Sequence, residues 1–302
     1  MTASHSCLHG ASGPLLVLCG GIFIGLAPIG LRLGLGELGP QAIAFWRFAF
    51  AVPLLFAAVL IVRGRLPSRP NRHVLVAGTC FALNVALWHW GLALTTVANA
   101  TFIVNLGNIS VGLLAWAILK ERLSLTWAVA FGIAVLGAAL LSLGGAAGGR
   151  ADIRGDLLSL GAAVMVSGYL LASKLSRQSL TGIETIFWLT LVEALVGFAM
   201  VGLSGEPYLP AAASGLAAPL FLAICVQVLG QGLIITGLGH TPAATAGVLI
   251  LVQPVTAALI SWQLFEETLT PFQGFGAGLI LCGIYLAARA GRRAKPEFVS
   301  QP

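Results

Sequence analysis

The stretch WAILKERLSL, from Trp116 to Leu125, has a counterpart near the end of the chain, WQLFEETLTP, which begins at Trp262. A tryptophan, a glutamate and a leucine recur at the same spacing in both stretches. When residues 91–137 are set against residues 237–283, an offset of 146, eleven positions are identical. Membrane composition alone produces matches of Leu, Ala and Gly, but it does not easily produce Trp, Glu and two glycines together. Internal duplication is therefore the better explanation.

The composition indicates a polytopic membrane protein. The 302 residues are 58% hydrophobic and 9% charged, whereas soluble domains are about 25% charged. A helical span of a bilayer needs about 20 apolar residues. The apolar runs are continuous and do not alternate with a period of two, which favours helices over a transmembrane barrel. Ten such runs fit the chain: 14–34, 40–62, 73–93, 97–118, 125–144, 154–173, 183–204, 213–236, 241–262 and 271–290.

The duplication and the odd number of spans per copy predict the topology. Each copy holds five spans, residues 1–145 and 146–302, so the second copy enters the bilayer from the opposite side. We therefore expect an all-α integral membrane protein of ten transmembrane helices, arranged as two inverted five-helix repeats. Twelve of the 16 Lys and Arg residues fall in loops on one side. By the positive-inside rule both termini are cytoplasmic, in a cell inner (plasma) membrane, and the basic charge needs no nucleic-acid partner.

Several segments resemble the drug/metabolite transporter superfamily, in its EamA-type branch. They are AFWRFAFAVPLL at 44–55, the two W-x4-E-x-L segments, and LVQPVTAALISW at 251–262. The resemblance covers nearly the whole chain and implies a ten-helix exporter; within the family, the chain looks most like the amino-acid exporters of the YddG type. Asn108 stands where the second copy has Pro254. A helix break at that depth is therefore expected in the second copy only.

Polar residues inside the apolar runs predict which helices surround a cavity. Such residues are costly in a bilayer and usually face the protein interior, and residues three or four apart share a helix face. On this basis the runs at 73–93, 97–118, 154–173, 213–236 and 241–262 would surround a solvated, substrate-binding cavity. Each side chain could instead only hydrogen-bond a neighbouring helix. The predicted binding residues are Asn84, Trp88, Thr101, Asn105, Asn108, Tyr169, Gln227, Gln231 and Gln253.

Two charged residues lie inside apolar runs, Arg47 and Glu193. Three interpretations remain open for them. In the first, they hold their helices together by pairing with each other or with polar neighbours. In the second, they act in gating. In the third, Arg47 attracts a carboxylate while Glu193 carries a proton or holds an ammonium group. Pro254 is a further candidate, as a flexible point in its helix. The runs at 125–144 and 271–290 have few polar groups but several glycines, including a G-x-x-x-G at Gly274 and Gly278, and are expected to be packing or outer helices.

The leading functional hypothesis is a secondary exporter of small metabolites that works by alternating access. A neutral polar cavity with aromatic surfaces suits neutral or aromatic amino acids, as does the resemblance. Multidrug or cationic-compound efflux is the alternative, and an intramembrane enzyme is a remote one. No P-loop, H-E-x-x-H or G-x-S-x-G motif occurs in the chain. We therefore expect no catalytic residues, cofactor or metal; the expected partners are a small-molecule substrate and membrane lipid. Coupling to protons, the direction of flux and the oligomeric state stay open.

Overall fold

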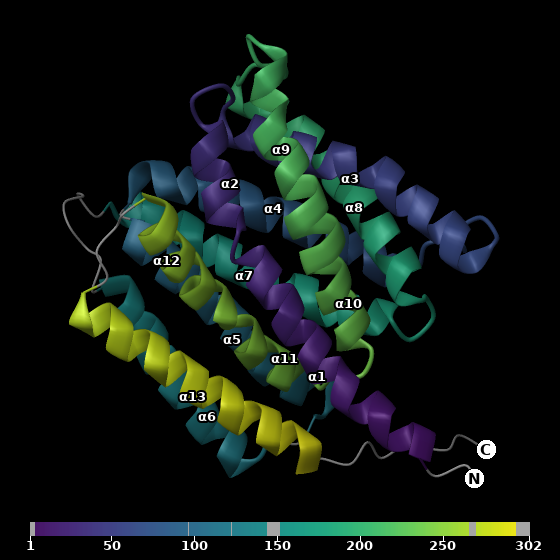
Figure 1. Ribbon diagram of the computed structural model, residues 1–302, viewed down its shortest axis with the longest axis vertical. Helices are drawn as coiled ribbons and strands as arrows, with labels where there is room; N and C mark the ends of the chain where they lie inside the picture. The colour runs from purple at the N-terminus through teal and green to yellow at the C-terminus, as the bar shows by residue number, and fades with distance from the viewer. Residues whose placement is uncertain (1–3, 96, 122, 144–151, 266–269, 294–302) are drawn as a thin grey trace.

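The computed structural model describes residues 4–95, 97–121, 123–143, 152–265 and 270–293 (Figure 1). All the regular elements in those ranges are helical. The first half holds α1 (Ser4–Ile24), α2 (Ala27–Gly34), α3 (Pro40–Arg63), α4 (Arg72–Leu94), α5 (Val97–Leu119) and α6 (Leu125–Leu143). The second half holds α7 (Ile153–Ser176), α8 (Gly182–Ser204), η1 (Ala213–Leu216), α9 (Ala217–Phe221), the π-helical η2 (Leu222–Gln231), α10 (Gly232–Leu238), α11 (Ala243–Ile250), α12 (Val252–Phe265) and α13 (Pro271–Arg293).

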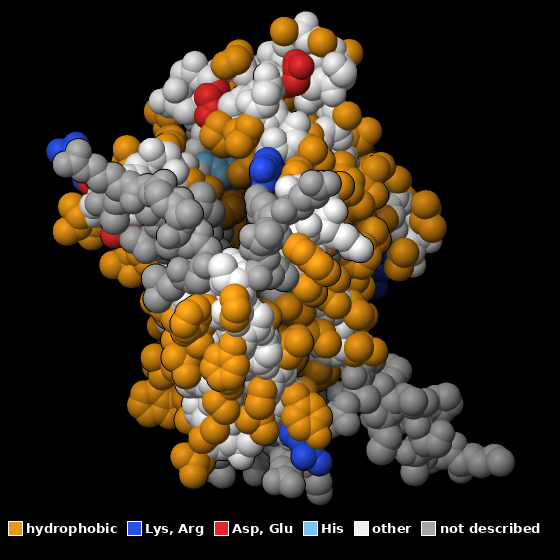
Figure 2. Space-filling view, turned by 60° about the vertical axis from the view of Figure 1, so that its left-hand side comes forward, with side chains coloured by type: hydrophobic (Ala, Val, Ile, Leu, Met, Phe, Trp, Pro, Cys, Tyr) orange, Lys and Arg blue, Asp and Glu red, His pale blue; other side chains and the backbone are white. Residues whose placement is uncertain are grey.

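Ten helical segments in the described ranges are long and apolar enough to cross a membrane, and they coincide with the ten expected runs. Three of these spans are built from more than one element: α1 with α2, η1 with α9, η2 and α10, and α11 with α12. Hydrophobic side chains cover the flank of the molecule, while charged side chains gather toward its ends (Figure 2). The repeated tryptophans, Trp116 and Trp262, are both more than half exposed. The all-α, ten-helix prediction is confirmed.

The helix pairs of the bundle follow the symmetry of the inverted repeats. Equivalent helices of the two halves pack on each other: α3 on α8, α5 on α11 and α6 on α13. The remaining spans pair in a reciprocal way. The third span of the first half, α4, packs on the first span of the second half, α7. Likewise α10, in the third span of the second half, packs on α1, in the first span of the first half. Both halves also end their second span with a left-handed glycine, Gly64 (φ 63°) and Gly205 (φ 72°). The fold thus agrees with a duplicated five-helix unit.

One pair of matched glycines shows how closely the reciprocal helices approach. A Cβ atom on Gly91 of α4 would lie 3.1 Å from the carbonyl oxygen of Gly155 on α7. Its sequence counterpart Gly237 on α10 faces Gly13 of α1 in the same way, at 2.7 Å from the carbonyl oxygen. Small residues allow such backbone contact in membrane helices. The duplicated glycine therefore preserves the same helix contact in each half.

Two of the spans are interrupted near their middle. The first span breaks between α1 and α2, within the three residues that precede Pro28. The ninth span breaks at Leu251, just before Pro254. Their counterparts differ, since α5 is continuous through Asn108. The expectation of a one-sided break at this depth is therefore confirmed. The physical reason is that proline cannot donate the backbone hydrogen bond that continues a helix, whereas asparagine can.

The glutamate of the first W-x4-E-x-L segment joins the two halves. The Glu121 carboxylate accepts hydrogen bonds from the backbone N–H groups of Ala243 and Ala244, at 3.0 and 3.2 Å. These N–H groups begin α11 and have no partner within the helix, and a carboxylate at a helix N-terminus is favoured by the helix dipole. The segment that revealed the repeat is thus an inter-repeat helix cap. Its twin, Glu267, lies outside the described residues.

The G-x-x-x-G of α13 does not make the closest helix contact, contrary to expectation. A Cβ atom on Gly274 or Gly278 would meet nothing within 4 Å. Gly276, two residues from each of them and therefore on the opposite side of the helix, instead faces α6: its Cβ would lie 2.6 Å from the Leu141 nitrogen and 2.7 Å from the Gly137 oxygen. Helices α6 and α13 do lie side by side at one edge of the bundle (Figure 1). The outer position was predicted, but the sequence motif marked the wrong face.

This geometry predicts opposite effects for two neighbouring substitutions. Gly276→Ala should lower the thermal unfolding midpoint in detergent, because the new methyl group meets backbone atoms, and overpacking costs about 1–3 kcal/mol. Gly278→Ala is the matched control and should leave the midpoint unchanged or raise it, because alanine is a better helix former than glycine by about 1 kcal/mol. Equal effects of the two substitutions would contradict the assigned packing face.

Candidate functional site

A cavity of about 160 Å³ lies inside the bundle, between helices of both repeats. Figure 2 shows a hollow in one face of the molecule, beside a basic side chain. Arg47 and Pro254, both singled out from the sequence, lie in the cavity wall. Most of the predicted binding residues also line it: Asn84, Trp88, Thr101, Asn105, Asn108, Tyr169, Gln231 and Gln253. Helical spacing therefore brought these side chains to one place, although their part in binding stays a prediction.

Two predicted residues do not line the cavity. Gln227 and Glu193 are fully buried and lie behind Arg47. Gln227 and Gln231 sit four residues apart in η2, yet the first faces α3 and α8 while the second faces the cavity. Sequence spacing could not separate them, because the difference depends on which helices surround η2.

Some of the lining amides are held by neighbouring groups. The Asn84 side-chain nitrogen donates to the carbonyl oxygen of Ala162 on α7, at 2.9 Å. The Asn108 side-chain nitrogen donates to the side-chain oxygen of Asn105, one turn earlier on α5, at 3.3 Å. These bonds fix the amides in the wall, and Asn84 also ties α4 to α7. The alternative of simple helix–helix bonding thus describes part of what Asn84 does.

Other polar groups of the lining have no partner. In the part of the chain that the structure describes, the indole nitrogen of Trp88, the hydroxyl of Tyr169 and both amide atoms of Gln231 are buried without a hydrogen bond. An unsatisfied buried polar group costs about 1–3 kcal/mol. Such groups are normally bonded to protein, ordered water or a ligand. All three residues line the same cavity, which marks it as a place where a polar solute or water can be bound.

Arg47 is linked to Glu193 through a neutral intermediary. Its Nε and Nη2 atoms donate to the side-chain oxygen of Gln227, at 3.1 and 2.8 Å. The side-chain nitrogen of Gln227 donates in turn to Glu193, at 2.6 Å, and to the Thr190 hydroxyl, at 2.7 Å. Among the described residues, the ion pair recorded within 4 Å is that of Arg63 with Glu184, so Arg47 and Glu193 do not form a direct salt bridge. The network joins α3, η2 and α8, which agrees with pairing through a polar neighbour.

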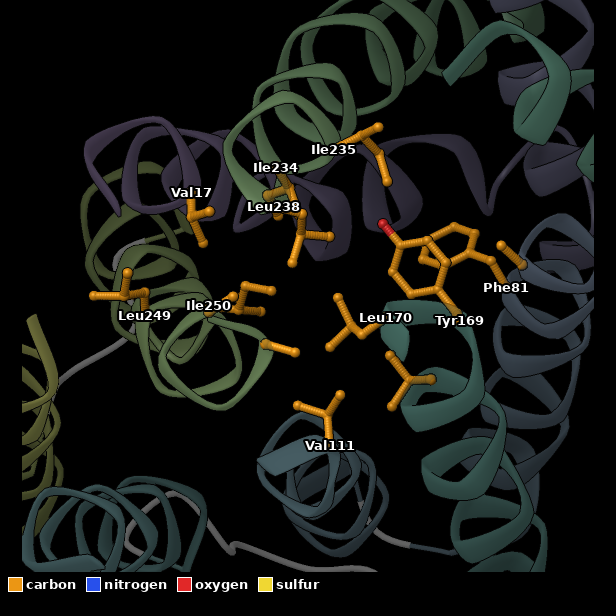
Figure 3. Close-up of a cluster of buried hydrophobic side chains, with 14 of the residues drawn as sticks. Val17, Phe81, Val111, Tyr169, Leu170, Ile234, Ile235, Leu238, Leu249 and Ile250 are labelled. Atoms are coloured by element: carbon orange, nitrogen blue, oxygen red, sulfur yellow. The ribbon is translucent and has the colours of Figure 1, made fainter. Parts of the chain in front are cut away.

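Aromatic rings flank the buried arginine. The guanidinium carbon of Arg47 lies 5.3 Å from the ring centre of Phe48 and 5.8 Å from that of Phe81, within the range of cation–π attraction. The Phe81 ring packs against Tyr169, with 4.8 Å between ring centres. Figure 3 shows this pair, with the Tyr169 hydroxyl directed away from α7. Phe81, Tyr169 and Arg47 thus form one continuous part of the cavity wall, both aromatic and cationic.

The first span also contributes to the cavity, which sequence reasoning missed. Ile24, Gly25, Ala27 and Pro28, at the break between α1 and α2, all belong to the lining. A Cβ atom on Gly25 would lie 2.8 Å from the carbonyl oxygen of Gln253, so the two interrupted spans cross in direct backbone contact. Gly25 and Pro28 were the available signal, because a Gly–Pro pair inside an apolar run suggests a helix break.

No group of three metal-binding side chains occurs among the described residues, so nothing in those ranges suggests a metal centre. The side chains that line the cavity offer hydrogen bonding, charge attraction and aromatic contact.

We expect replacement of the two glutamines of η2 to affect stability differently. Gln227→Leu should lower the thermal unfolding midpoint strongly, since removing the shared partner of a buried charge network costs about 3–5 kcal/mol. Gln231→Leu should cost little, because the amide that it removes has no partner to lose. Thermal unfolding of both purified variants tests this contrast. A comparable loss in both would mean that the network does not stabilise the bundle as described.

Comparison with known proteins places the chain in a family. Among curated proteins, it is 27% identical to the uncharacterized transporter YwfM of Bacillus subtilis, over 74% of this chain and 75% of the relative. It is 29% identical to an uncharacterized transporter of Archaeoglobus fulgidus, over 88% of this chain and 95% of the relative. A protein crystal structure, 20% identical, shares the fold with a TM-score of 0.81 over 94% of this chain and 99% of the other.

A family model matches both halves of the chain. The EamA-like transporter family model matches residues 11–143 and again residues 153–289, so that each half carries one copy. These matches fall on the two sets of five spans that pack in reciprocal pairs. The protein is therefore a multi-pass membrane transporter that belongs to the EamA-like transporter family.

Proposed function

We propose that the protein exports small metabolites by secondary transport, with neutral and aromatic amino acids as its preferred substrates. The observation that carries this proposal is a cavity, enclosed by both repeats, whose largely apolar and aromatic wall carries polar side chains, and several buried polar atoms of these side chains have no protein partner among the described residues. A site built from unpartnered donors and acceptors suits a solute that brings hydrogen bonds of its own.

The size and charge of the cavity support a small amphipathic substrate. Sites for drug-sized ligands usually measure about 300–1,000 Å³, whereas this cavity measures about 160 Å³. Arg47 is the charged residue in its lining, and Trp88, Tyr169 and Phe81 supply aromatic surfaces. A polyphosphorylated solute would call for several buried cations, and an extended cationic drug for carboxylates that this lining does not contain.

Alternating access is the mechanism that the architecture supports best. The cavity lies between inverted repeats, where rocking of one unit against the other can expose a fixed site to either face. The interrupted spans α1–α2 and α11–α12 meet at this cavity. Because a helix bends most easily where its hydrogen bonds are interrupted, these two breaks are the flexible points at which each repeat would move. In the membrane, the positive-inside rule puts both termini in the cytoplasm, with the protein in the inner (plasma) membrane.

Flux into proteoliposomes that contain the purified protein tests the function. We expect labelled phenylalanine or another neutral amino acid to enter, and excess unlabelled amino acid to block the entry. A labelled cationic dye and a purine are tested as alternative substrates. An imposed pH gradient separates proton-coupled transport from facilitated diffusion. Transport of the dye alone would favour multidrug efflux instead and would contradict the amino-acid proposal.

Bulky substitutions in the lining test the site of transport. Asn105→Trp and Gln231→Trp should reduce amino-acid flux at least about tenfold by filling a cavity of only 160 Å³, while the folded protein is retained. The matched control is Leu113→Trp, on the exposed, membrane-facing side of the same helix as Asn105, which should transport normally. Normal flux in both lining variants would place the pathway elsewhere in the molecule.

A further inference from the structure

We propose that Arg47 binds the carboxylate group of the substrate inside the cavity. This assignment rests on the proposed function and adds to it the group by which a substrate would be recognised. It chooses one of the interpretations left open by the sequence, in which a buried arginine could be structural, could act in gating or could attract an anion. The choice depends on how the guanidinium group is held.

The hydrogen bonds of Arg47 leave one side of its guanidinium free. An arginine carries five N–H donors in a planar fork. Nε and Nη2 both donate to a single acceptor, the side-chain oxygen of Gln227. Among the described residues, no acceptor is recorded for Nη1. Because Arg47 also belongs to the cavity lining, this unused part of the fork is the part available to a solute.

The neutral link to Glu193 preserves the ability of Arg47 to bind an anion. A direct carboxylate–guanidinium pair would occupy the fork, since such pairs are frequently bidentate. Here Gln227 stands between the two groups, so that the carboxyl group of Glu193 does not occupy the guanidinium fork. The arginine is thereby held firmly from behind, which lowers the entropy lost when a ligand binds.

The neighbouring groups fit a carboxylate as well. The Tyr169 hydroxyl and the Trp88 indole N–H are donors, they line the same cavity, and neither has a partner among the described residues. An indole nitrogen can only donate, so at least one unsatisfied group calls for an acceptor. The Phe81 ring contacts both the Tyr169 ring and the Arg47 guanidinium. These rings offer an apolar surface to the rest of an aromatic solute.

Loss of the carboxylate from the ligand provides the test. Phenylalanine and phenylalaninamide differ in this group and are closely similar in shape. We expect the purified wild-type protein to prefer phenylalanine by about 10- to 100-fold, the range for hydrogen bonds to charged groups. The preference is measured as ligand-induced thermal stabilisation and as competition with labelled phenylalanine for flux.

The variants remove the cation and keep the fold. Arg47→Gln alone leaves Glu193 buried without its counter-charge and can fail to fold, so the decisive variant is the double one, R47Q/E193Q, which replaces both charged groups with amides. In it the preference for phenylalanine over its amide should fall to about onefold. Arg154→Gln is the matched control: Arg154 is exposed at the start of α7, and its replacement should preserve the wild-type preference.

The outcomes separate this inference from the proposed function. A double variant that retains the preference, or a wild-type protein that shows no carboxylate-dependent stabilisation, overturns the assignment of Arg47. In those cases the amino-acid transporter still stands if labelled amino acids cross the membrane. Absence of amino-acid flux in the wild type counts against the proposed function itself, whereas binding that depends on both the carboxylate and Arg47 supports the assignment.

Discussion

The structure depends on the rule that backbone polar groups must find partners inside a bilayer. Continuous helices satisfy this rule by themselves, but this chain interrupts two of its spans, before Pro28 and before Pro254. Each proline leaves the carbonyl group four residues earlier, at Ile24 or Ile250, without its usual donor. Broken backbone at this depth is tolerated only where protein or a cavity covers it. The two interruptions are packed against each other through Gly25, and Ile24 and Ile250 both line the cavity. Cavity and breaks are therefore parts of one arrangement.

The bundle is symmetric where it supports the cavity and asymmetric where it forms the lining. Three features repeat between the halves: the pairing of the spans, the matched glycines, and a glycine with positive φ at the end of the second span. Within the lining, Asn108 of one half stands in the position of Pro254 in the other, so the fourth span is continuous and the ninth is broken. The two halves thus share their scaffold, whereas the side chains that line the cavity differ between them. The network of Arg47, Gln227 and Glu193 belongs to the diverged part, and all three of its side chains are buried.

Much of this could be predicted from residues alone. Composition and apolar run length determine the ten helices, because a bilayer admits few alternatives, and the recurring Trp and Glu reveal the duplication. Helical spacing identified polar faces on five spans, and eight of the nine predicted residues line the cavity. Spacing could not show that Gln227 faces Arg47 rather than the cavity, since this depends on the packing of η2 between α3 and α8. The face of α13 that contacts α6 was likewise missed, because Gly276 is the middle residue of the G-x-x-x-G and lies on the opposite side of the helix from Gly274 and Gly278.

The central claim is that a substrate sits in the cavity between the repeats with its carboxylate at Arg47. The most direct measurement is an experimental structure of the protein determined with phenylalanine bound. We expect density for the amino acid between Tyr169 and Gln231, with the carboxylate within hydrogen-bonding distance of Nη1 of Arg47. Density for the ligand at another place, or with its ammonium group toward Arg47, would contradict the account.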